Sequence, residues 1–174
     1  MPFLPGTDIA PMSLQDLLAL AAFAFVTSIT PGPNNMMLMA SGANFGLRRT
    51  LPHLLGVALG FVFMLVLVGA GITRVLEASP LLGEVLRWAC VLMLVRLAFA
   101  LARAGGPEDA AARATPLTFL QAAAFQWVNP KAWAMALTAV GAYAPTSDPA
   151  TLALVGLVFG LVNLPSTGLW AVLG

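Results

Sequence analysis

Charged residues are scarce in this sequence. They make up 9% of its 174 residues, while apolar residues make up 60% and the mean hydropathy is +0.92. A soluble domain has about 25% charged and 45–50% apolar residues, because it must present a polar surface to water. The composition therefore predicts an integral membrane protein, and its long apolar runs predict transmembrane helices, so the expected fold class is all-α. The net charge of +1 gives no indication of a nucleic-acid partner.

Cysteine and membrane-embedded acidic residues are also nearly absent. The single cysteine, Cys90, excludes an internal disulfide and a multi-cysteine metal site, and its apolar surroundings predict a buried, inert thiol. No Asp or Glu lies well inside any apolar run. An intramembrane aspartyl protease, a metal centre or a carboxylate proton relay therefore has no residues to use. We expect neither an enzyme nor a bound cofactor or metal.

Both ends of the sequence lack basic residues. Residues 1–12 contain no Lys or Arg, which argues against a signal peptide and predicts a retained first span. The sequence before Gly174 is apolar and has no basic anchor. We therefore expect a single transmembrane domain over residues 1–174 that is truncated at its C-terminus, with a sixth helix missing.

Five apolar runs are each about long enough to cross roughly 30 Å of hydrocarbon. The first follows Ser13, a suitable helix cap, and has Asp16 in its first turn. It is broken at Pro31-Gly32-Pro33, because each proline lacks an N–H and clashes with the carbonyl four residues earlier. The fourth run is broken in the same way at Asn129-Pro130-Lys131. The expected spans are residues 14–43, 51–72, 85–101, 117–143 and 150 to the end, with polar connections at 42–49, 74–84 and 104–116.

The two proline breaks lie in the first and fourth spans, as in two three-helix halves of inverted topology. Such paired breaks are the best sequence indication of a transporter's substrate site. Half-helices that start near Asn34 and Lys131 would present free N–H groups to a carboxylate. The alternative is that the breaks are kinks whose polar side chains only satisfy freed backbone groups. The candidate substrate-binding residues are Thr30, Pro31, Gly32, Pro33, Asn34, Asn35, Gln126, Asn129, Pro130 and Lys131.

Three basic residues of the expected spans, Lys131, Arg96 and His53, bear on the function. Lys131 adjoins the second break, and because a charge at mid-membrane is costly, we expect it to face the protein interior and to pair with a substrate carboxylate. The alternative for Lys131 is that its side chain snorkels to the membrane interface. For Arg96, in the third span, a functional role and snorkelling are equally weighted alternatives. His53, at the start of the second span, is expected to be an interfacial residue and not a proton carrier.

Two further patterns concern the orientation of the chain and its contacts. Basic residues follow the first and third spans (Arg48, Arg49, Arg103, Arg113) more often than the second (Arg74, Arg87). The positive-inside rule then predicts an N-terminus outside the cytoplasm. Gly56 and Gly60 have GxxxG spacing, which permits a close helix approach and makes a homodimer possible.

These motifs resemble those of the LysE/RhtB family of bacterial amino-acid exporters. The resemblance covers nearly the whole chain, although Arg96 stands where a tyrosine or another apolar residue is expected. It implies a small inner-membrane protein of about six helices that exports amino acids or close derivatives with the proton gradient. The Thr-Pro-Gly-Pro-Asn-Asn form is most similar to the cysteine/O-acetylserine branch. The residues that carry the resemblance are Thr30 to Asn35, Gly42, Gly46, Arg48, Gly56, Gly60, Arg87-Trp88 and the segment 125–132.

The resulting hypothesis is an alternating-access exporter of neutral amino acids, located in the bacterial inner membrane and surrounded by lipid. The substrate carboxylate would meet half-helix N–H groups and Lys131. The amino group would be oriented by Asn34, Asn35 and Asn129. The main alternative is a non-transporting membrane scaffold in which the breaks are dry and fully packed, and a passive channel is a further one.

Overall fold

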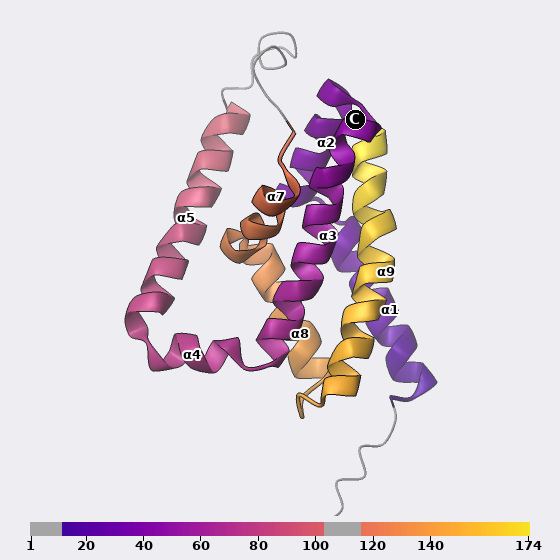
Figure 1. Cartoon of the computed structure of the whole chain (residues 1–174), viewed down its shortest axis with the longest axis vertical. Coiled ribbons are helices and arrows are strands. Elements are labelled where there is room, and N and C mark those ends of the chain that lie inside the picture. Colours follow the sequence, from indigo (N-terminus) through magenta and orange to yellow (C-terminus); the bar gives the residue numbers. More distant parts are fainter. Residues whose placement is uncertain (1–11, 103–115) are drawn as a thin grey trace, which may run out of the picture.

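The computed structural model describes residues 12–102 and 116–174, and in these ranges the chain is helical with no β-strand (Figure 1). The all-α fold class is therefore confirmed. Arg103 and Arg113, on which part of the predicted orientation depends, lie outside the described residues. In chain order the helices are α1 (Leu14–Ile29), α2 (Pro33–Phe45), α3 (Leu47–Gly69), α4 (Ile72–Ala78), α5 (Pro80–Ala102), α7 (Phe119–Phe125), the 3-10 turn η1 (Gln126–Val128), α8 (Pro130–Tyr143) and α9 (Pro149–Leu173).

Side-chain caps fix where the helices begin. Ser13 Oγ accepts the backbone N–H of Asp16 at 3.1 Å, and the Asp16 carboxylate accepts the N–H of Ser13 in return. This capping box satisfies two N–H groups that would otherwise have no partner in the first turn of α1. Thr118 and Gln121 form the same box at the start of α7. The predicted cap at Ser13 is confirmed.

The proline breaks lie where the sequence predicts them. The axis turns by 57° between α1 and α2, and Thr30 and Gly32 have extended backbones at the break. Pro33 and Pro130 are the first residues of α2 and α8, a position where a missing N–H costs nothing. In Figure 1, α1 and α2 run upward while α7 and α8 run downward, as an inverted repeat requires.

The connections are shorter than expected. The predicted turn over residues 42–49 is reduced to Gly46, because α2 continues to Phe45 and α3 starts at Leu47. Gly46 has φ = 73°, a backbone conformation that glycine adopts without a steric penalty. Residues 74–84, expected as a polar connection, instead contain parts of α4 and α5, which meet at 109°.

The core forms around α3 and α9. Helix α3 packs against α2, α7, α8 and α9, and α9 packs in turn against α1 and α2. Phe61 and Phe159 meet at the α3–α9 contact, with ring centroids 5.3 Å apart, and both are buried. These two helices therefore hold both proline breaks in one compact bundle.

The GxxxG pair is used within the chain. A Cβ on Gly60 would lie 2.6 Å from Ala123 Cα of α7, and a Cβ on Gly56 would overlap the carbonyl oxygen of Phe119. Only glycine lets α7 approach α3 this closely. Because α7 occupies this face, the pair does not supply the homodimer interface that its spacing suggested.

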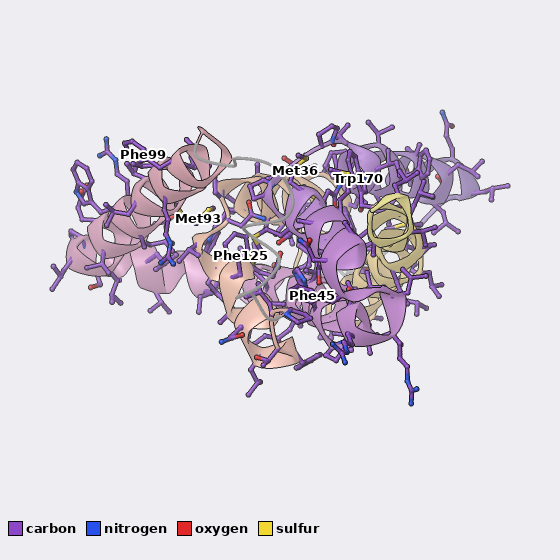
Figure 2. All side chains as sticks on the ribbon, turned by 90° about the horizontal axis from the view of Figure 1, so that it is seen from above. Met36, Phe45, Met93, Phe99, Phe125 and Trp170 are labelled. Carbon is purple, nitrogen blue, oxygen red and sulfur yellow. The ribbon has the colours of Figure 1, made fainter. Side chains whose placement is uncertain are left out.

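Helix α5 stands apart from the bundle, and its side chains radiate on all sides (Figure 2). Its main contacts are with α4 and η1. Trp88 and Arg96 are exposed, and Cys90 is half-buried, so the expectation of a buried thiol was wrong. The isolation of α5 leaves an almost wholly apolar helix surface free for lipid or another helix.

Two of the described helices, α3 and α9, are each long and apolar enough to cross a membrane. The bent pairs α1–α2 and α4–α5 raise the number to as many as four. The segment expected as the fourth span consists of the shorter pieces α7, η1 and α8. The predicted number of five spans therefore stays a prediction, whereas the multi-pass helical architecture agrees with the sequence.

Candidate functional site

The two proline breaks meet in space. Lys131, at the start of α8, donates from Nζ to the carbonyl oxygen of Thr30 at 2.7 Å and to its hydroxyl at 3.0 Å. Asn34 and Gln126 exchange hydrogen bonds through their side-chain amides, at 2.8 and 3.2 Å. Residues about 100 positions apart in the sequence are thus joined directly, as the inverted-repeat interpretation expects.

Both carbonyls that the prolines of the first break deprive of a helical partner are occupied. Pro31 removes the partner of the Thr27 carbonyl, which accepts the hydroxyl of Thr30 at 3.1 Å. Pro33 removes the partner of the Ile29 carbonyl, which accepts the indole N–H of Trp170 at 3.0 Å. Buried backbone oxygens need such partners in a bilayer, where water is absent. Trp170 of α9 therefore stabilises the first break.

Two of the predicted asparagines serve the backbone. Asn35 donates its amide to the carbonyl oxygens of Ser28 and Thr30, each at 2.8 Å. Asn129 caps α8, because its side-chain oxygen accepts the N–H of Lys131 at 3.1 Å. These are the bonds that the alternative drawn from the sequence expects, namely polar side chains that satisfy freed backbone groups at a kink.

The two half-helix N-termini differ. The N–H groups at the start of α2 have no side-chain cap, so Asn34 and Asn35 present backbone donors there. At the start of α8 the side chain of Asn129 already occupies the N–H of Lys131. Helix N-termini attract anions through free N–H groups and the helix dipole. The first break is therefore the better anion-binding end.

Gly32 provides the space for Lys131. A Cβ at this position would lie 2.8 Å from Lys131 Cδ and 3.1 Å from Nζ. The lysine stem therefore lies directly against the glycine backbone. A side chain on residue 32 would displace the ammonium group from Thr30.

A small cavity lies between the breaks, with a volume of about 20 Å³, space for one water molecule. Helices α3 and α9 complete its wall through residues such as Phe61 and Asn163. Lys131 is the one charged residue among those that line it. Six of the predicted residues line the cavity, namely Gly32, Asn34, Asn35, Gln126, Asn129 and Lys131, whereas Thr30, Pro31, Pro33 and Pro130 shape the breaks around it.

Sequence reasoning left two features of this region unassigned or misplaced. Asn163 and Thr167 of α9 line the cavity, although in the sequence they are only isolated polar residues in an apolar run. His53 was expected at the interface, but its side chain is 1% exposed, and neither ring nitrogen has a partner among the described residues. His53 is buried because its side of α3 faces the bundle. Its position near the start of a span does not reveal which side that is.

Broken helices of opposite direction that meet at a polar, singly charged cavity inside an apolar bundle define an integral membrane protein of the transporter class. The chain belongs to the family of LysE type translocators, whose model matches residues 25–170. The resemblance predicted from the motifs is thus confirmed, and the protein is a transporter and not an enzyme. It is a multi-pass membrane protein.

Two relatives illustrate the similarity. The chain is 31% identical over 161 residues to the cysteine/O-acetylserine efflux protein of Escherichia coli (strain K12), which covers 91% of this chain and 82% of the relative. It is 27% identical over 158 residues to the protein of the same name from Klebsiella pneumoniae, covering 90% and 80%. No solved structure matches the chain.

Proposed function

We propose that this protein exports a neutral amino acid or a close derivative across the bacterial inner membrane, by alternating access driven by the proton gradient. The observation that carries the proposal is the contact between Lys131 and Thr30, which places one cation between two broken helices. The relatives from Escherichia coli and Klebsiella pneumoniae are named as cysteine/O-acetylserine efflux proteins, so small neutral amino acids of this kind are the first candidates.

Lys131 is the proposed partner of the substrate carboxylate. The carbonyl oxygen of Thr30 accepts two donors, Lys131 Nζ at 2.7 Å and Asn35 Nδ2 at 2.8 Å. When Lys131 turns to a carboxylate, Asn35 still satisfies this carbonyl, so the exchange leaves no backbone oxygen at the break without a partner. The uncapped N–H groups of α2 would bind the same carboxylate.

The size of the cavity supports a mechanism in which the two halves move. A volume of about 20 Å³ holds one water and is too small for an amino acid. Substrate entry therefore requires α1–α2 and α7–α8 to separate, which breaks the Asn34–Gln126 pair. Opening alternately toward either side would move the substrate across the membrane.

Of the predicted site residues, Lys131, Asn34, Gln126 and Gly32 are proposed to act on the substrate directly or to make room for it. Asn35 and Asn129 would hold the backbone of the two breaks in place. The prolines at positions 31, 33 and 130, with Thr30, would set the geometry of the breaks. In this proposal Asn35 and Asn129 bind the backbone of the breaks and not the amino group of the substrate.

The orientation and surroundings are further parts of the proposal. Arg48 and Arg49 lie at the end of the bundle opposite the start of α1, which supports an N-terminus on the periplasmic side (Figure 1). Lipid would cover the apolar outer faces, including that of α5. A homodimer would have to use a face other than that of Gly56 and Gly60. The whole chain would act as one transmembrane domain.

Uptake of labelled amino acids into inside-out vesicles tests the proposal. Gradient-dependent uptake is expected for the wild type, and Lys131→Met should reduce it by about 10-fold or more, because a charge-assisted bond to the carboxylate is lost. Arg96→Met is the matched control, since it removes a cation that is exposed on α5. A wild-type protein that transports no amino acid would favour the scaffold alternative. Equal uptake by both variants would remove Lys131 from the site.

A further inference from the structure

Asn163 occupies a special position on α9. It lies 135 residues from Ser28 in the sequence, yet it donates its amide N–H to the hydroxyl of Ser28 at 3.0 Å. Its side chain is 4% exposed and lines the same cavity as Lys131. It belongs to neither proline break, so the argument from paired breaks gives it no role.

The other polar atom of this side chain is left over. Oδ1 of Asn163 is buried and has no hydrogen-bond partner among the described residues. The backbone carbonyl of Asn163 is satisfied by the hydroxyl of Thr167 at 2.7 Å, so its unpaired acceptor is the side-chain oxygen. A buried acceptor without a donor costs about 1–3 kcal/mol, and such an atom calls for an explanation.

The cavity gives that explanation. Asn163 lines this cavity, which has space for one water, and that water would donate to Oδ1 when no substrate is bound. A substrate that displaces this water must bring its own N–H or O–H donor, or the oxygen is left unsatisfied. The cavity therefore offers a cation, Lys131, for an acidic group and a free acceptor, Asn163, for a donor group. This combination matches the two ends of an amino-acid zwitterion.

We propose that Oδ1 of Asn163 accepts an N–H of the substrate's α-ammonium group, and that the transporter therefore requires a free amino group. The proposal rests on the proposed export function and adds its second recognition point. Ser28 is a positioning residue, because its hydroxyl holds the amide of Asn163 so that Oδ1 is left for the substrate. Substrates whose amino group is absent bind weakly, since they leave this acceptor unpaired.

A cycle of paired deletions in protein and ligand tests this inference. Inside-out vesicles take up the labelled amino acid that the wild type accumulates, and unlabelled compounds are compared as inhibitors of this uptake. The first amino acid to use is L-cysteine, under reducing conditions. Its analogue without the amino group is 3-mercaptopropionate, and its analogue without the carboxylate is cysteamine. Loss of the amino group should weaken inhibition of the wild type by roughly 10- to 100-fold, as expected for a hydrogen bond to a charged group.

The variants assign each loss to a residue. The amino penalty and the carboxylate penalty are the factors by which inhibition weakens when that group is missing from the inhibitor. In Asn163→Leu the amino penalty should vanish, so that cysteine and 3-mercaptopropionate inhibit about equally, while the carboxylate penalty persists. In Lys131→Met the carboxylate penalty should vanish and the amino penalty persist. Ser166→Ala is the matched control, because Ser166 is buried on the same helix but bonds to the carbonyl of Val162 in its own helix. It should behave as the wild type.

Three results would overturn the proposal. An amino penalty that is the same in Asn163→Leu and in the wild type would show that Asn163 does not bind the ammonium. Loss of the carboxylate penalty in Asn163→Leu would show that the amide N–H faces the substrate instead. If Asn163→Leu does not fold, Asn163→Asp takes its place, because it keeps the acceptor and adds a negative charge. Cysteamine should then inhibit uptake by Asn163→Asp more strongly than uptake by the wild type. Inhibition that is no stronger would contradict the assignment. A wild type that transports no amino acid would instead refute the proposed function.

Discussion

The side-chain amides of Asn34 and Gln126 hydrogen-bond each other in both directions, at 2.8 and 3.2 Å, across 92 residues of sequence. Gln126 also donates to the carbonyl oxygen of Ala122, which fixes its orientation within α7 and η1. A pair of this kind holds two half-helices in register without any charge. Together with the contact between Lys131 and Thr30, it joins the two breaks beside the cavity.

The first prediction concerns this pair. Asn34→Ala and Gln126→Ala should each destabilise the folded protein, and the double variant should be less destabilised than the sum. The expected coupling is about 1 kcal/mol, because one reciprocal hydrogen-bonded pair is lost once. Thermal unfolding in detergent measures it. Strictly additive losses would mean that the two amides act independently.

The second prediction concerns Gly32. Its backbone is extended, with φ near −172°, so alanine fits the backbone but its Cβ would lie 2.8 Å from Lys131 Cδ. Gly32→Ala should therefore displace Lys131 and reduce uptake by about 10-fold, with little change in thermal stability. Gly141→Ala is the control, because its Cβ would meet nothing within 4 Å. Full activity of Gly32→Ala would show that transport does not depend on the position of the Lys131 side chain.

The sequence predicts the breaks but not the partners of the residues around them. Proline chemistry alone places the end of α1 and the starts of α2 and α8. The positions of the breaks in the first and fourth spans suggest that the two breaks meet. Asn34 and Asn35 are adjacent and identical in type, yet one reaches across to Gln126 and the other turns back to Ser28. Successive residues of a helix point in different directions, so the rotation of α2 about its axis decides which asparagine faces Gln126. The hydrophobic periodicity of so short a helix does not determine this rotation.

The same limit explains the two buried groups that the sequence misplaced or left without a role. The position of His53 near a span start suggests the interface, but burial depends on which face of α3 meets the bundle. Asn163 is one amide in a long apolar helix, and only its distance to Ser28 gives it a place in the cavity. Contacts between segments that are far apart in sequence cannot be derived from one segment alone.

The third prediction concerns the close contact of α3 with α7. A Cβ on Gly60 would lie 2.6 Å from Ala123 Cα and 2.9 Å from its Cβ, so Gly60→Ala must push the two helices apart. We expect a loss of about 1–3 kcal/mol, seen as a lower midpoint of thermal unfolding. Gly160→Ala is the matched control, because its Cβ would lie 3.4 Å from Val62, close to an ordinary contact. An unchanged midpoint for Gly60→Ala would mean that α7 can move away from α3 without loss of folding free energy.

The fourth prediction concerns His53. Its ring is 1% exposed and neither nitrogen has a partner among the described residues. Replacing it by Leu, which is of similar size, removes two unsatisfied polar atoms and should stabilise the protein by about 1–3 kcal/mol. His53→Gln keeps polar atoms at this place and should bring no such gain. A lower unfolding midpoint for His53→Leu would indicate a polar partner, such as a bound water.

The fifth prediction concerns the pH dependence of the cap on α9. The backbone N–H and the hydroxyl of Thr151 both bond to the carboxylate of Asp148, at 2.9 Å each, and hold its pKa below the usual value of 3.8. Because the folded-state pKa is the lower one, ionised Asp148 stabilises the fold above the unfolded-state pKa. This contribution disappears as the pH falls through the folded-state pKa.

Asp148→Asn isolates the charge, since asparagine also caps helices. The wild type should unfold at a higher temperature than Asp148→Asn near pH 6, where the carboxylate is ionised and faces the positive end of α9. The difference should shrink as the pH is lowered from about pH 6 to about pH 3, because the wild-type carboxyl group then takes up a proton. A difference that stays constant over this range would mean that Asp148 acts through its shape as a cap and not through its charge.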